Sequence, residues 1–102
     1  MKYQLVLQLP ASSVKDYDAM IELEEAILRR LGNIGTVDGH DAGSGEINIF
    51  ILTDHPTLAF ERVKQVLGTK DFMPELKVAY REIGIDGFTI LHPADLSHFG
   101  IA

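Results

Sequence analysis

Asp38, His40 and Arg81 are the residues whose types and spacing best suit acid–base chemistry. Asp38 and His40 are two positions apart in a segment with strand character, so regular alternation places both side chains on one face, about 7 Å apart. A carboxylate beside an imidazole can orient a general base or a metal ligand. Arg81, in a later predicted strand, would anchor an anionic substrate. The structural alternative is a polar edge strand, because polar edges discourage aggregation between sheets.

Glu24 is the fourth candidate catalytic residue, as an acid. At 100° per residue it falls inside the apolar stripe of a predicted helix, which consists of Tyr17, Met20, Ile21, Ile27, Leu28 and Leu31. A buried carboxylate is costly unless it finds a hydrogen-bond partner or takes up a proton. We therefore expect Glu24 to be more than half buried and within reach of a donor. The alternatives are a slightly rotated helix and a purely structural pairing of Glu24.

The run from Asp38 to Glu46 is rich in glycine and in oxygen ligands, which raises the question of a metal or phosphate site. It lacks the acidic spacing and the final glutamate of an EF-hand loop. Gly43-Ser44-Gly45 leads into a strand, with no following lysine and no helix N-terminus, so it is not a phosphate loop. Tight turns explain these glycines better, and we predict no metal and no cofactor.

The stretch DGHDAGSGEINIFILTD, residues 38–54, resembles a segment carried by short bacterial proteins of about this length. The resemblance extends over most of the chain and implies a bacterial protein. Because those proteins have no assigned function, it implies no activity, cofactor or catalytic residue.

Strand and helix patterns alternate along the chain and must position these residues. Tyr3–Leu9 alternates apolar and polar residues and stops at Pro10, as a strand with one buried face does. The helix that contains the Glu24 stripe is expected to start at a serine N-cap, Ser12 or Ser13, and to stop at a glycine. The other predicted elements are strands at 35–42 and 46–53, a helix from Pro56 to Gly68, and strands at 76–85 and 88–91.

This order, βαββαβ with one more strand, indicates an α+β fold. Two right-handed crossovers favour a ferredoxin-like sandwich with the strand order 4-1-3-2 and both helices on one face of an antiparallel sheet. The opposite face is left without helices. On that face, an apolar strip of Val6, Phe50 and Leu52 lies among polar residues, as in many interfaces, so we predict a homodimer.

The strand order also limits the acid–base site. Asp38 and His40 belong to the second strand and Arg81 to the fourth, at opposite edges of the sheet and about 14 Å apart. One small substrate would not reach both edges within a single chain. The enzyme hypothesis therefore requires a dimer in which a two-fold axis brings Arg81 of one subunit toward His40 of the other.

Length and composition suit one domain over residues 1–102 with an irregular tail at 94–102. The chain is 46% hydrophobic and 24% charged, and its net charge is −6 with scattered basic residues. A nucleic-acid binder normally has a basic face, so we predict no nucleic-acid partner. The sequence contains no cysteine, no apolar run of membrane length and no signal-peptide pattern. We therefore predict a cytoplasmic protein without a membrane partner.

Two functions from different classes remain. The first is a non-enzymatic interaction or ligand-sensing module that self-associates through its open sheet face and binds a protein or a small anionic ligand. The alternative is a small dimeric enzyme that uses the Asp38/His40 pair, with Arg81 holding the substrate. Single-stranded RNA binding is disfavoured, because Phe50 is a single aromatic on the face of an acidic protein.

Overall fold

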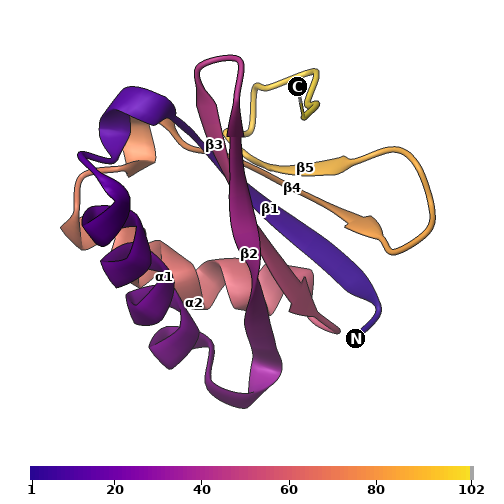
Figure 1. Ribbon diagram of the computed structural model, residues 1–102. Helices are drawn as coiled ribbons and strands as arrows, with labels where there is room; N and C mark the ends of the chain where they lie inside the picture. Colours follow the sequence, from indigo (N-terminus) through magenta and orange to yellow (C-terminus); the bar gives the residue numbers. More distant parts are fainter. Residues whose placement is uncertain (102) are drawn as a thin grey trace.

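The computed structural model describes residues 1–101. The chain forms one antiparallel sheet of five strands, and two helices cover one face of this sheet (Figure 1). The elements are β1 Tyr3–Pro10, α1 Tyr17–Leu31, β2 Gly35–Gly43, β3 Glu46–Thr53, α2 Pro56–Thr69, β4 Lys77–Glu82 and β5 Thr89–His92. Each predicted strand and helix is present; β3 has the predicted ends, and the ends of the others are shifted. Residues 94–101 form an irregular tail, as predicted, and Ala102 lies outside the described residues. Neither helix is long and apolar enough to cross a bilayer, within residues 1–101.

The strands follow the order β2-β3-β1-β4-β5, and every neighbouring pair is antiparallel. The first four strands have the predicted 4-1-3-2 arrangement, with β1 and β3 in the centre. β5 extends the sheet beyond β4, so the sheet differs from that of a simple βαββαβ unit. Figure 1 shows a strong twist, in which β2 and β5 at the two edges run in clearly different directions.

The core lies between the two helices and one face of the sheet. Alternate residues of β1, namely Leu5, Leu7 and Leu9, point into it and are almost completely buried. The helices contribute Met20, Leu23, Ile27, Leu31, Ala59, Phe60, Val63 and Leu67. Each fully buried leucine or isoleucine contributes roughly 1.5–3 kcal/mol of stability. This packing determines which face of the sheet stays free of helices.

Asp16, and not Ser12 or Ser13, caps the N-terminus of α1. Its Oδ1 accepts a hydrogen bond from the backbone N–H of Ala19 at 2.8 Å, which satisfies one free donor of the first turn. The two serines lie in a separate 3-10 turn. Tyr17, a predicted member of the buried stripe, is 70% exposed. The helix is therefore rotated relative to the predicted phase.

Three cross-strand rows form the helix-free face of the sheet: Arg81, Gln4, Leu52 and Thr36; Ala79, Val6, Phe50 and Gly39; and Lys77, Gln8, Asn48 and Asp41. Val6 and Ala79 in the middle row are fully buried although no helix covers them. The tail lies on this side, since the backbone carbonyl of Gly100 accepts a hydrogen bond from Nε2 of Gln8 at 3.0 Å. The chain thus covers part of the predicted apolar strip itself.

Candidate functional site

A β-bulge in β2 separates Asp38 from His40. Pairing with β3 is regular up to Val37 and resumes at Gly39, so Asp38 is an extra residue on this strand. His40 then pairs with Ile49, whose side chain belongs to the core, and lies on the helix-covered face. The prediction that Asp38 and His40 share one face is therefore wrong, and the expected acid–base pair does not form.

Glu24 on α1 is the partner of His40. Oε1 of Glu24 lies 3.0 Å from Nδ1 of His40, and the two side chains are 13% and 27% exposed. The prediction that Glu24 is more than half buried and close to a donor is confirmed. The rotation of α1 places Glu24 at the flank of the buried stripe, next to the edge strand. The contact therefore ties α1 to β2.

We expect Glu24→Leu to change the free energy of unfolding by less than about 1 kcal/mol. His40 keeps access to water, which replaces the carboxylate, and the leucine adds apolar area beside α1. Urea denaturation measures the effect, with Glu25→Leu on the exposed neighbouring residue as the control. A loss of more than about 2 kcal/mol for Glu24→Leu alone would show that the pair is essential to the fold.

Two neighbours hold Arg81 in place on the helix-free face. Its Nε donates a hydrogen bond to Oε1 of Gln4 at 3.0 Å, and its guanidinium carbon lies 4.8 Å from the centre of the Phe88 ring. Phe88 packs edge-on against Phe99 of the tail, with ring centres 4.9 Å apart. The sequence analysis did not predict that Phe88 or Phe99 lies near the site, because no periodicity in the sequence indicates a contact between a loop and the tail. These contacts restrict the guanidinium and leave its terminal N–H groups for a ligand.

Arg81 borders a pocket of about 520 Å³ on the helix-free face. The lining residues come from four strands and from the loop after β4: Gln4, Asp38, Leu52, Arg81, Ile83, Gly84, Ile85 and Asp86. Asp38 and Arg81 therefore border one pocket within a single chain. The prediction that Arg81 lies on an edge strand is wrong, because β5 pairs with β4. Arg81 reaches over β1 to Gln4, and the loop after β4 adds a wall.

The pocket combines opposite charges with apolar surface. Among the lining residues that the structure describes, Arg81 is the only cation, and Asp38 and Asp86 are the only carboxylates. The apolar surface comes from Leu52 and from the two isoleucines in loop residues 83–85, which are 51% and 56% exposed. A few placed charges among apolar side chains are typical of a site for a small organic molecule.

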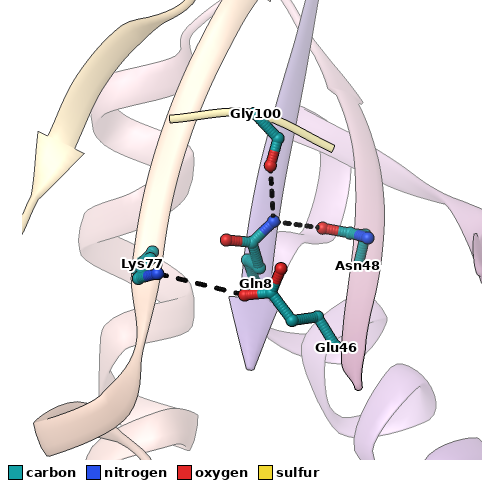
Figure 2. A network of polar contacts seen from close by, with 5 residues as sticks. All are labelled: Gln8, Glu46, Asn48, Lys77 and Gly100. Atoms are coloured by element: carbon teal, nitrogen blue, oxygen red, sulfur yellow. Dashed lines mark hydrogen bonds and ion pairs between the residues drawn. The ribbon is translucent and has the colours of Figure 1, made fainter. Parts of the chain in front are cut away.

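Buried amides form a polar network at the other end of the same face (Figure 2). Nε2 of Gln8 donates to Oδ1 of Asn48 at 2.9 Å and to the carbonyl of Gly100, and Nδ2 of Asn48 donates to Oδ1 of Asp41 at 3.1 Å. Gln8 and Asn48 are 3% and 1% exposed. Within residues 1–101 no buried side-chain polar atom lacks a partner. The network therefore holds the tail on the sheet and is structural.

Comparison with known proteins does not assign the site to a family. No family model matches the chain, and no curated protein and no solved structure matches it significantly. The resemblance to short bacterial proteins stays a prediction. In the part of the chain that the structure describes, no three metal-ligating side chains gather into a candidate centre. The function must therefore be inferred from the residues of the pocket.

Proposed function

We propose that this protein is a non-enzymatic module that binds a small molecule bearing an anionic group. The observation that carries the proposal is the restrained guanidinium of Arg81 at a pocket of about 520 Å³. Guanidinium offers parallel N–H donors that match the two oxygens of a carboxylate. Because Nε of Arg81 already donates to Gln4, the ligand would accept from the two terminal nitrogens.

The restraint on Arg81 supports binding as its role. A free arginine side chain loses rotamer entropy when it binds a ligand, and this loss weakens affinity. Gln4 and Phe88 have already ordered the side chain before a ligand arrives. Leu52 and the loop isoleucines then provide apolar surface for the uncharged part of the ligand.

The enzyme alternative has lost its acid–base pair. Asp38 borders both the pocket on the helix-free face and the hollow next to Glu24, whereas His40 lines neither and contacts Glu24 on the opposite face. The hollow of about 390 Å³ next to Glu24 is not lined by His40, so the imidazole does not border the space that a substrate would fill there. In this proposal Arg81 is the binding residue, Asp38 borders the same pocket, and Glu24 and His40 are structural.

Arg81→Gln tests the proposal with hexanoate as the probe. We expect at least tenfold weaker binding, because a charge-assisted hydrogen bond is typically worth roughly 1.5–3 kcal/mol. The measurement is a titration followed by amide chemical shifts of residues 81–86. Lys77→Gln is the matched control, since it removes one positive charge from the same strand and face but lies outside this pocket. Equal loss in both variants would indicate diffuse attraction and contradict a site at Arg81.

Self-association through the helix-free face is a second part of the proposal. The tail leaves Phe50 and Leu52 partly exposed, next to the two isoleucines of the loop after β4, which are more than half exposed. An apolar patch bordered by polar residues supports a homodimer, because contact with a second copy would remove it from water. Leu52 and the two isoleucines also line the pocket, so in this dimer the pocket would lie at the interface between the two copies.

A ferredoxin-like fold is a third part of the proposal. The order of the first four strands and the position of both helices on one face support a ferredoxin-like sandwich extended by β5. The bacterial origin and the cytoplasmic location stay predictions.

A further inference from the structure

The charges on the pocket walls do not suit a simple anion. Its lining residues include one cation, Arg81, and two carboxylates, Asp38 and Asp86. A ligand that carries only a negative group would gain from Arg81 and would be repelled by both carboxylates. A ligand that also carries a positive group would be attracted both by Arg81 and by the carboxylates.

The spacing of the strands sets the distance between these two groups. The guanidinium of Arg81 reaches β1, where its Nε bonds to Gln4. Asp38 lies on β2, and β3 separates β2 from β1, so two strand spacings of about 10 Å remain across the sheet. Asp38 is also two residues along β2 from Thr36, which ends the row of Gln4. The short Asp38 side chain and the bound groups take up part of this distance. Between them lies Leu52 of β3, an apolar surface for methylene groups.

Resting on the proposed function, we infer that the ligand is a linear zwitterion whose carboxylate binds Arg81 and whose ammonium or guanidinium group binds Asp38. An extended six-carbon ω-amino acid separates its charged ends by about 7–8 Å, which fits the gap. A four-carbon analogue spans only about 5 Å and would not reach both walls. Basic amino acids, with a cation at the end of a long side chain, belong to the same class.

Binding of three probes to the wild-type protein tests the inference: 6-aminohexanoate, 4-aminobutyrate and hexanoate. We expect 6-aminohexanoate to bind at least tenfold more tightly than either of the others, and all binding to depend on Arg81. Amide chemical shifts report the affinities, as for the Arg81→Gln variant.

Asp38→Asn assigns the cationic end of the ligand. We expect it to reduce the affinity for 6-aminohexanoate about tenfold, to the level of hexanoate, and to leave or improve the affinity for hexanoate. Asp86→Asn is the comparison variant, because it removes the same charge from the same pocket. Asp86 lies on the loop that follows the Arg81 strand, on the side where the ligand carboxylate binds, so we expect a smaller loss of 6-aminohexanoate affinity than with Asp38→Asn.

The outcomes separate this inference from the proposed function. If hexanoate binds as tightly as 6-aminohexanoate and Arg81→Gln weakens both, the zwitterion is excluded and the anion-binding module stands. If no probe binds, or if binding does not depend on Arg81, the proposed function itself is excluded. If Asp86→Asn removes the preference and Asp38→Asn does not, the assignment to Asp38 is overturned. The comparison of 6-aminohexanoate with the shorter 4-aminobutyrate uses only the wild-type protein, so it decides the inference even if Asp38→Asn misfolds.

Discussion

Replacing Asn48 with leucine is expected to lower the free energy of unfolding by about 2–3 kcal/mol. Asn48 is 1% exposed, accepts a hydrogen bond from Gln8 and donates one to Asp41. Leucine has a similar size, so the cost comes from the lost hydrogen bonds and from the buried amide of Gln8, and not from a cavity. Urea denaturation of both proteins gives the difference. Asp41→Ala, at the exposed end of the network, should cost less than about 1 kcal/mol.

A double-mutant cycle shows whether the network acts as a unit. Gln8→Leu alone removes the contact with Asn48 and also the contact with the carbonyl of Gly100. When both amides are replaced by leucine, no polar partner is left unsatisfied between them, so the double variant should lose about 1 kcal/mol less than the sum of the single variants. Additive losses would contradict the coupling inferred from the geometry.

Light scattering at micromolar concentration is expected to give twice the chain mass of 11.3 kDa for the wild type, and 11.3 kDa for Phe50→Asp. Phe50 lies in the middle row of the helix-free face and is partly exposed, so a buried aspartate there would be desolvated in the dimer. Tyr17→Asp is the control. It places an acid on the helix layer, where the side chain is 70% exposed, and should leave the dimer intact.

A wild-type mass of only 11.3 kDa would reject the homodimer. Phe50→Asp also affects the centre of the sheet, so a second variant keeps the test decisive if that protein unfolds. Ile85→Asp changes a loop residue that is 56% exposed, which costs the monomer little. It should still dissociate a dimer formed through the apolar patch.

Periodicity along the chain was sufficient to predict the helices and strands, and the rule of right-handed crossovers added the order of the first four strands. The alternation of Tyr3–Leu9 identified a central strand, and the apolar run around Ile49 identified its neighbour. The position of Glu24 among apolar residues correctly predicted a buried carboxylate with a partner. These features depend on local patterns of burial, which a sequence records directly.

The composition of the candidate site could not be predicted, because it depends on register and on distant contacts. The bulge at Asp38 turns His40 to the opposite face, and regular alternation cannot anticipate it. The available signal was Gly39, a glycine inside a strand that adopts a φ of 120° beside the bulge. The contact of Phe88 with Arg81 joins a loop to a strand, and the tail that bonds to Gln8 has no periodicity at all.

The bulge in β2 also makes the strand tolerant of the deletion of one residue, Asp38. Loss of one residue from a regular strand turns every later side chain over to the other face. Asp38 is the unpaired extra residue, so its deletion would join Val37 to Gly39 in regular pairing and leave His40 facing α1. The pocket, however, would lose a carboxylate. A one-codon deletion would therefore be a single evolutionary step that changes the charge of the pocket while the strand stays in register.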